Sequence, residues 1–392
     1  MSLNETPSAN RIHIGFYGKR NSGKSSLINA FTGQQVAIVS DVAGTTTDPV
    51  YKAMEVHGIG PCVFIDTAGV DDVGELGKMR VEKTEKAAEK TDIAVLLFSG
   101  EEYSAELEWF RYFKENHTPI LCVLSKADTL TGSDAIAAQL KEEIKQEILV
   151  ISSKSKEDIE KFKEELIRLV PDDYGEETIT GALVEEGELV LLVMPQDIQA
   201  PKGRLILPQV QTIRDLLDHK CLVMSCTTDK LEDTLAALAR PPKLIITDSQ
   251  VFRTVYDKKP QESLLTSFSV LFAEYKGDFA YYKESAAAIS SLTEESKVLI
   301  AECCTHAPLK EDIGREKIPN MLRKRIGAGL TVDIVSGTDF PKDLSNYDLI
   351  IQCGACMFNK KYVMTRIDTW ARIPTTSCFS LFSAMSAALT LR

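Results

Sequence analysis

The sequence predicts an α/β protein of three domains, in which a phosphate-binding-loop domain is followed by two smaller parallel α/β domains. Three observations support this prediction. A phosphate-binding pattern follows a β-rich run near the N-terminus, short apolar runs alternate with helix-like stretches over the later chain, and two of these runs end in cysteines. A chain of 392 residues is also too long for one ordinary core. We therefore expect domains over residues 1–171, 172–262 and 263–392.

Charge and composition exclude several classes of protein. The formal net charge of −12 argues against a protein that coats nucleic acid or lies on an anionic membrane. Residues 1–10 carry no leader pattern, and no apolar run is long enough to span a bilayer. Nine cysteines scattered over a large chain differ from the dense, even framework of a secreted domain. We expect a cytoplasmic protein with reduced thiols that binds neither nucleic acid nor membrane.

A phosphate-binding loop organises the first domain. Residues 11–17 form a β-rich run, residues 18–25 carry the pattern G-x-x-x-x-G-K-S, and residues 26–31 continue as a helix. In this arrangement Lys24 reaches the β and γ phosphates, and the Ser25 hydroxyl ligates Mg²⁺. The residues assigned to phosphate binding are Gly18, Asn21, Ser22, Gly23, Lys24, Ser25 and Ser26.

Two further segments indicate a switch that responds to the γ-phosphate. Residues 62–65 form a short apolar strand that leads into Asp66-Thr67-Ala68-Gly69, where Asp66 can hold Mg²⁺ through water and the Gly69 N–H can sense the γ-phosphate. Upstream, residues 44–48 lie in a segment without periodicity, and Thr46 would join the metal only with triphosphate bound. The predicted catalytic residues are therefore Lys24, Thr46, Asp66 and Gly69, with Ser25 and Thr46 as Mg²⁺ ligands.

Two later loops predict that the protein recognises guanine rather than another base. Residues 119–124 read as a buried strand that ends in Ser125-Lys126-Ala127-Asp128. Asp128 would accept hydrogen bonds from guanine N1–H and N2–H₂, and Lys126 would lie along the base. Residues 148–151 lead into Ser152, Ser153 and Lys154, whose backbone would meet guanine O6. Together with the switch segments, these loops predict a P-loop GTPase fold.

These motifs, in this order over residues 11–170, resemble the translation-factor-like small GTPases, and most of all the branch that contains TrmE and Era. Two residues depart from that branch. Ser125 replaces the usual Asn of the base-recognition motif, which removes an amide contact to the base, and Val70 stands where a water-positioning Gln is found in other GTPases. We therefore expect hydrolysis to be slow or to rely on another group. The resemblance also implies that K⁺, held near Asn21, stimulates it.

A second α/β domain is predicted after the acidic, turn-rich linker at residues 171–177. Three strand-like runs, at residues 188–194, 221–224 and 243–247, alternate with two helix-like stretches, at residues 209–217 and 231–239. The sequence shows no nucleotide-binding fingerprint here. Our working hypothesis is that this domain makes the protein a homodimer.

The third domain carries a candidate metal site. We predict strands over residues 264–272 and 330–335 and a helix over residues 279–289. A buried strand at residues 297–302 is followed by Cys304 and His306. A second buried strand at residues 347–352 is followed by Cys353 and Cys356. Ligands bind at the carboxyl ends of the strands in open α/β sheets, so these residues form one site if the two strands are neighbours. On the ligands alone, zinc and an iron–sulfur cluster remain equal alternatives.

The whole chain resembles the HydF family of FeFe-hydrogenase maturation GTPases, because a TrmE-type GTPase is joined to Cys304-x-His306, a spacer of 46 residues and Cys353-x-x-Cys356. The resemblance implies a 4Fe-4S cluster on Cys304, Cys353 and Cys356, with His306 as a labile ligand; Cys303 lies beside Cys304 and is not assigned. It also implies GTP/GDP and Mg²⁺ in the first domain and a di-iron subcluster precursor as cargo. Radical-SAM maturases and the apo-hydrogenase would be the partners.

Two other functions fit parts of the sequence. The first domain alone fits a tRNA-modification or ribosome-assembly GTPase, which should carry a basic RNA-binding appendage that this acidic chain does not supply. A zinc-stabilised regulatory GTPase fits the ligand count of the third domain. Zinc is colourless and an iron–sulfur protein is brown, so colour separates this alternative from the HydF-like one.

Overall fold

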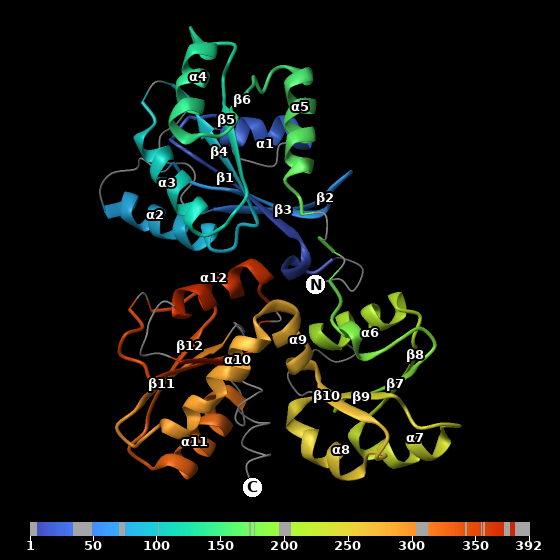
Figure 1. Ribbon diagram of the computed structural model, residues 1–392. Helices are drawn as coiled ribbons and strands as arrows, with labels where there is room; N and C mark the ends of the chain where they lie inside the picture. The colour runs from blue at the N-terminus through green and yellow to red at the C-terminus, as the bar shows by residue number, and fades with distance from the viewer. Residues whose placement is uncertain are drawn as a thin grey trace. The chain divides into compact units, whose positions relative to one another are not determined.

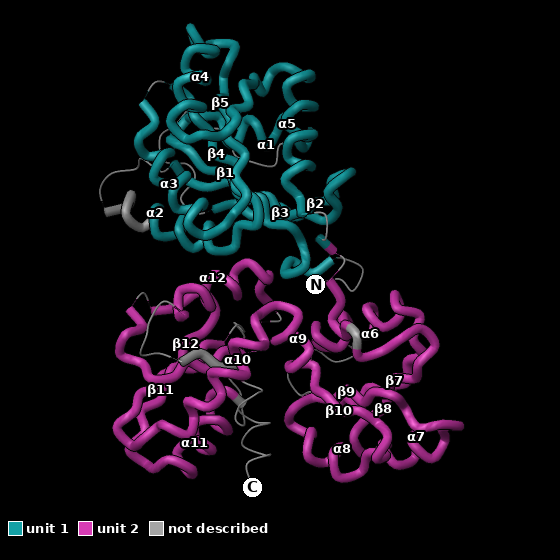
Figure 2. Tube along the Cα trace, in the orientation of Figure 1, with its two compact units in different colours: residues 1–174 teal, residues 175–392 magenta. Residues whose placement is uncertain are grey.

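The computed structural model describes residues 6–33, 49–69, 75–100, 102–171, 174–175, 177–195, 205–302, 313–341, 343–353, 355, 357–371 and 377–380. The chain divides into two compact units, residues 1–174 and residues 175–392 (Figure 2). The described residues form one sheet in the first unit and two in the second. The predicted fold class is confirmed, because each sheet is covered by helices and all strand pairs but one are parallel.

The first unit is built on a six-stranded sheet with the order β2-β3-β1-β4-β5-β6, in which only β2 and β3 are antiparallel (Figure 1). Its strands are β1 (Ile12–Gly18), β2 (Val50–Val56), β3 (Gly60–Asp66), β4 (Ile93–Phe98), β5 (Ile120–Leu124) and β6 (Leu149–Val150). Its α-helices are α1 (Lys24–Thr32), α2 (Glu75–Ala88), α3 (Ser104–Glu115), α4 (Ser133–Ile144) and α5 (Lys156–Arg168).

Both faces of the central strands of this sheet are buried. Along β1, Phe16 packs into one apolar cluster with Phe64 and Phe162, and the next residue, Tyr17, packs into a second cluster with Phe113. Successive residues of a strand point to opposite faces, so a strand between two helical layers must be apolar throughout. This explains why β4 reads as the continuous apolar run IAVLLF.

The second unit contains a four-stranded parallel sheet with the order β10-β9-β7-β8. Its strands are β7 (Leu189–Val193), β8 (Leu222–Cys226), β9 (Leu244–Thr247) and β10 (Leu264–Ser267), and the helices α6 (Leu207–Asp218), α7 (Leu231–Ala237) and α8 (Phe252–Lys258) lie between them in the sequence. The predicted strands and helices of the middle region are thus confirmed. Strands β8 and β10 are the two edges of this sheet.

A second four-stranded parallel sheet in this unit has the order β12-β11-β13-β14. Its strands are β11 (Lys297–Glu302), β12 (Thr331–Ser336), β13 (Leu349–Gln352) and β14 (Ser377–Ser380). The α-helices after β10 are α9 (Phe268–Lys276), α10 (Phe279–Ser285), α11 (Ile318–Ile326) and α12 (Lys360–Ala371). Strand β14 was not predicted from the sequence.

The strand predicted over residues 264–272 is wrong in two respects. Its first four residues are β10, which pairs with β9 in the sheet of the middle region, and the rest belongs to helix α9. The Ser267 hydroxyl accepts a hydrogen bond from the Val270 N–H at 3.3 Å and so caps the helix. Phe268, Leu271 and Phe272 then lie on one helical face, because their spacing of three and four residues matches the helical repeat.

Candidate functional site

The phosphate-binding loop joins β1 to α1. Gly23 and Asn21 have φ angles of 99° and 58°, in the left-handed region. A Cβ on Gly18 would lie 2.5 Å from the Leu97 carbonyl oxygen, so only glycine fits this position. The Lys24 side chain folds back over the loop, where its Nζ donates to the carbonyl oxygens of Gly18 at 2.8 Å and Lys19 at 2.9 Å. The loop therefore places a buried ammonium group at the N-terminus of α1, where phosphate binds in such folds.

Asp66 lies beside this loop because β3 is the neighbour of β1 and pairs Asp66 with Phe16. The Ser25 hydroxyl donates to Asp66 Oδ2 at 2.6 Å. Burial raises the pKa of the Asp66 carboxyl, whereas the hydrogen bond from Ser25 and the charge of Lys24 lower it. Asp66 Oδ1 is buried and has no hydrogen-bond partner among the described residues. A half-buried hydroxyl in contact with a buried carboxylate, of which one oxygen is unsatisfied, fits a site for hydrated Mg²⁺.

The segment after Asp66 approaches the phosphate-binding loop closely. A Cβ on Gly69 would lie 2.7 Å from the backbone nitrogen of Arg20. The Thr67 hydroxyl donates to the Phe16 carbonyl oxygen at 2.6 Å and fixes the segment to β1. Gly69 is therefore placed beside the loop, as a γ-phosphate sensor requires. The predicted switch threonine Thr46 lies outside the described residues, and so does Val70, which was expected to make hydrolysis slow.

The residues predicted to recognise the base come together from two strand ends, β5 and β6. Asp128 accepts hydrogen bonds from the Ser152 hydroxyl and the Lys154 ammonium, both at 2.8 Å. These two contacts lower the pKa of the Asp128 carboxyl. The adjacent Ser153 is half-buried, and Lys126 is exposed with a φ of 59°. Asp128 is thus held as a carboxylate, the form that accepts two hydrogen bonds from guanine.

Ser125 has a role that the sequence did not reveal. Its hydroxyl donates to the Ser22 carbonyl oxygen at 2.5 Å and lies 3.2 Å from the Phe98 carbonyl oxygen, and the residue is only 6% exposed. The side chain therefore connects the base-recognition segment to the phosphate-binding loop. The sequence analysis predicted only a lost contact with the base, because the approach of residues 125 and 22 depends on the order of strands in the sheet.

The two strands that precede the cysteines are neighbours. Strands β11 and β13 are parallel, with Val298 opposite Leu349 and Ala301 opposite Gln352. The Cys353 N–H continues this pairing and donates to the Ala301 carbonyl oxygen at 3.1 Å. The predicted metal site required the two strands to be neighbours, and this requirement is met.

The metal site itself stays a prediction. Cys304, His306 and Cys356, together with Cys303, lie outside the described residues. Over the part of the chain that is described, no three His, Cys, Asp or Glu side chains are grouped to hold a metal ion. Cys353 is half-buried and packs against the apolar clusters on both faces of the sheet.

Polar side chains near the carboxyl ends of β11 and β12 form a network that the sequence analysis missed. Glu302 Oε2 accepts hydrogen bonds from Arg315 Nε at 3.0 Å and from the Ser336 hydroxyl at 3.2 Å. Arg315 Nη2 in turn donates to Ser336 Oγ at 2.6 Å. Glu302 is only 9% exposed, so the ion pair with Arg315 stabilises its charge. The network fixes the end of the strand that precedes Cys304.

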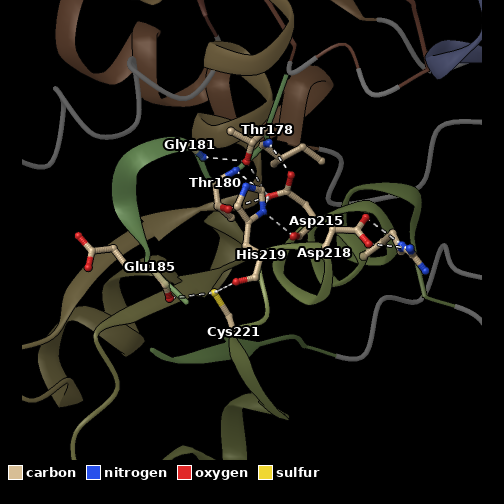
Figure 3. A network of polar contacts seen from close by, with 10 residues as sticks. Thr178, Thr180, Gly181, Glu185, Asp215, Asp218, His219 and Cys221 are labelled. Carbon is tan, nitrogen blue, oxygen red and sulfur yellow. Dashed lines mark hydrogen bonds and ion pairs between the residues drawn. The ribbon is translucent and has the colours of Figure 1, made fainter. Parts of the chain in front are cut away.

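A second polar network involves a histidine and a cysteine but is structural (Figure 3). Asp215 of α6 accepts hydrogen bonds from Ile179 N at 3.0 Å and from Thr180 N at 2.9 Å, which ties the segment before β7 to this helix. His219 Nδ1 lies 2.7 Å from the Asp215 carbonyl oxygen, and Cys221 Sγ contacts the Glu185 carbonyl oxygen at 3.5 Å. These contacts pair the polar atoms of His219 and Cys221 with backbone carbonyl groups of the fold.

Three family models match the chain. Residues 13–126 match the family of 50S ribosome-binding GTPases. Residues 179–277 match the hydrogen maturase F dimerization domain, and residues 280–389 match the hydrogen maturase F tetramerization domain. The two maturase models together cover most of the second unit.

Individual relatives match a smaller part of the chain. The tRNA modification GTPase MnmE of Flavobacterium johnsoniae is 33% identical over 170 residues, which are 41% of this chain and 36% of that protein. GTPase Der of Wolinella succinogenes is 47% identical over 98 residues, which are 24% of this chain and 20% of that protein. A crystal structure of Era in complex with MgGDPNP and part of 16S ribosomal RNA covers 59% of this chain and 98% of its own, at 16% identity and a TM-score of 0.38. The chain thus spans well under half the length of these two sequence relatives.

Proposed function

The chain belongs to the hydrogen maturase F family, and from this premise we propose that it hydrolyses GTP and carries a metal cluster during maturation of FeFe-hydrogenase. The observation that carries the proposal is the combination of two sites in one chain. The first unit contains the proposed site for a guanine nucleotide. In the second unit two neighbouring strands end shortly before cysteines, β11 before Cys304 and β13 before Cys353 and Cys356. Neither of these two sites alone distinguishes a maturase from other GTPases or other metal-binding proteins.

In the proposed nucleotide site each residue has a defined task. Lys24 binds the β and γ phosphates, Ser25 and Thr46 ligate Mg²⁺, and Asp66 holds the ion through water. Gly69 senses the γ-phosphate, and Asp128 reads guanine with help from the loop at residues 152–154. We propose slow hydrolysis, because Val70 has no polar group with which to orient the attacking water.

The proposed metal site is a 4Fe-4S cluster held by Cys304, Cys353 and Cys356, with His306 at an exchangeable position. Thiolates at the ends of two adjacent parallel strands fit this cluster, and Cys353 already lies at such an end. When bound, the cluster would supply an iron that can take and release an outside ligand. The di-iron subcluster precursor is then the cargo, received from radical-SAM maturases and delivered to the apo-hydrogenase.

We further propose that GTP acts as a switch rather than as a reactant at iron. Order in residues 44–48 and 66–70 depends on the γ-phosphate in such GTPases, so hydrolysis would change the surface that a partner maturase contacts. Among the residues that the structure describes, no helix is both long and apolar enough to cross a membrane. The cytoplasmic location stays a prediction.

The proposed homodimer would form through edge strand β8. Leu222 and Met224 of this strand are 54% and 41% exposed, although both are apolar. An edge strand with exposed apolar side chains offers unpaired backbone groups to a second strand. Two copies related by a two-fold axis would pair their β8 strands antiparallel and extend the sheet across both chains.

The decisive experiment is anaerobic reconstitution with iron and sulfide, followed by iron and sulfide analysis and a visible spectrum. The wild-type chain and the variants Cys304→Ala, Cys353→Ala and Cys356→Ala are compared with Cys226→Ala, a matched control from β8. The proposal predicts a brown protein with about four irons per chain, lost in the first three variants and kept in the control. A colourless protein that binds zinc would instead make the site structural and contradict the carrier function.

A further inference from the structure

Helix α9 connects the cores of the two sheets in the second unit. Phe268, Leu271 and Phe272 pack into the core under the sheet of β7 to β10, and Ala273 packs into the core that contains Leu299 of β11. The helix ends at Lys276, whose side chain is only 1% exposed. A buried lysine is rare, because its charge must be stabilised by polar partners. Its partners therefore indicate what the residue does.

The Lys276 ammonium binds the turn that follows β13. Its Nζ donates to the Phe358 carbonyl oxygen at 2.7 Å and lies 3.4 Å from the Ala355 carbonyl oxygen. It also lies 5.6 Å from the centre of the Phe272 ring, within the range of a cation–π contact. In the sequence, Ala355 and Phe358 flank Cys356, and Ala355 follows Cys353 by two residues. The ammonium therefore holds the backbone at Ala355 and Phe358, on either side of the position of Cys356 in the sequence.

This turn needs such support because its backbone is in an unfavourable conformation. Ala355 has a φ of 51°, in the left-handed region that residues other than glycine rarely adopt. The Phe358 N–H donates to the Ala355 carbonyl oxygen at 3.1 Å and closes the turn. On the other side, the Phe358 ring packs edge-on against Tyr362 of α12, with centroids 4.5 Å apart. The turn is thus fixed between the end of α9 and the start of α12.

We propose that Lys276 is a positioning residue for the metal-binding turn: its buried ammonium holds the carbonyl groups of Ala355 and Phe358 and so keeps the paired cysteines ready to bind. The metal part of this inference rests on the proposed function. Outer contacts of this kind control how tightly ligands hold a metal.

The test compares Lys276→Met, Lys276→Arg and Lys283→Met in the full chain. Methionine matches the length of lysine but donates no hydrogen bond, and Lys283 is an exposed lysine of α10 that controls for the same substitution. Hydrogen exchange of the metal-free proteins is measured first. We expect amides at residues 353–359 to exchange roughly 5- to 10-fold faster in Lys276→Met, as for the loss of one buried hydrogen-bonded contact. Lys276→Arg, which keeps the charge and the donors, should recover part of this protection.

After reconstitution, the same variants are treated with an iron chelator. We expect Lys276→Met to lose iron about 10-fold faster than wild type, in the range found for outer contacts of metal ligands, and its midpoint potential to become more negative. The proposed role is overturned if Lys276→Met leaves the exchange at residues 353–359 unchanged. It is also overturned if exchange becomes faster evenly over residues 264–371 and Lys276→Arg does not restore the protection. If the wild-type chain takes up no iron, the proposed metal function fails, and the exchange data of the metal-free chain still decide the role of Lys276.

Discussion

At the scale of single residues, Ser125 shows how one departure from a motif changes the site. The hydroxyl keeps the base-recognition segment attached to the phosphate-binding loop through Ser22, although it offers no amide to the base. We therefore expect guanine recognition to depend mainly on Asp128, whose carboxylate is positioned by Ser152 and Lys154.

We predict that Ser125→Ala weakens GDP binding about 10-fold, because a buried carbonyl of the loop loses its hydrogen bond. Thr129→Ala is the matched control, since the exposed Thr129 hydroxyl also donates to a backbone carbonyl, that of Lys126 at 3.1 Å. Isothermal titration with GDP measures both variants. Equal affinities for wild type and Ser125→Ala would show that the contact with Ser22 does not support the loop.

We predict that Mg²⁺ binding depends on pH through Asp66. Burial holds the pKa of this carboxyl above its ordinary value of 3.8, and only the ionised form can hold hydrated Mg²⁺. Mg²⁺ affinity should therefore weaken as the pH falls toward this raised pKa, and Asp66→Asn should lose both the affinity and its pH dependence. Titration of Mg²⁺ into the GDP complex at several pH values measures this.

The same shift has the opposite effect on the metal-free chain. The raised pKa of Asp66 means that the native state binds this proton more tightly than the unfolded state does. The free energy of unfolding without Mg²⁺ should then decrease as the pH rises from the ordinary to the raised value of this pKa. If the contribution of Asp66 to the free energy of unfolding instead grows as the pH rises between these two values, the pKa of Asp66 is not raised in the native state.

We predict that K⁺ accelerates GTP hydrolysis more than Na⁺ does, and that Asn21→Ala removes the difference. Asn21 is exposed in the phosphate-binding loop and has a φ of 58°, so its side chain is available to an ion beside the phosphates. Hydrolysis is measured in matched KCl and NaCl solutions. Equal rates in the two salts for the wild-type chain would count against a potassium site.

At the scale of elements, the two edge strands of the β7 to β10 sheet carry exposed leucines. Leu222 on β8 is 54% exposed and Leu264 on β10 is 47% exposed. Exposure alone does not distinguish these edges. The distinction comes from Met224, 41% exposed, which makes the apolar stretch on β8 longer.

We predict that Leu222→Lys converts the dimer into a monomer at micromolar concentration, because a charge at a paired edge opposes strand association. Leu264→Lys on the opposite edge is the matched control and should leave the dimer intact. Light scattering coupled to size exclusion measures both. Dissociation by Leu264→Lys alone would move the interface to β10, and a monomeric wild-type chain would refute the dimer itself.

Helix α9 also shows why an apolar run is ambiguous at this scale. Residues 264–272 are rich in apolar residues and were predicted as one strand, but Ser267 ends β10 and caps α9. Periodicity cannot separate a buried strand from a buried helix over so few residues. The serine was the available signal, since hydroxyl residues are preferred at helix N-caps.

At the scale of the whole molecule, the two units have separate cores. The clusters around Phe16 and Tyr17 contain only residues of the first unit, and those around Leu299 and Leu192 contain only residues of the second. A nucleotide bound in the first unit should therefore stabilise that unit directly.

We predict two transitions in calorimetry of the full chain, of which GDP with Mg²⁺ raises only one. GDP at about 100 times its dissociation constant should stabilise the first unit by about 2.7 kcal/mol. Lys24→Ala, which removes the phosphate-binding ammonium, should abolish this shift. A shift of both transitions by the same amount would show that the units unfold together.

The class of the fold could be predicted from the sequence alone and is confirmed, and the residues of the nucleotide site were predicted in the same way. The phosphate-binding pattern, the Asp66 to Gly69 segment and the loop of Asp128 are each contained in a few consecutive residues beside a strand. Most strands and helices were also predicted, because burial on both faces produces continuous apolar runs. Local patterns of this kind can be read without knowing which strands pair.

The contacts between residues far apart in the chain could not be predicted from the sequence and became known from the packed structure. It placed β11 beside β13, moved β10 into the sheet of the middle region, and brought the Ser125 hydroxyl to Ser22. It also brought Lys276 to the carbonyl of Ala355, 79 residues away in the chain. The physical reason is that strand order and buried polar contacts depend on how whole elements pack, whereas the local sequence records only whether each element is buried.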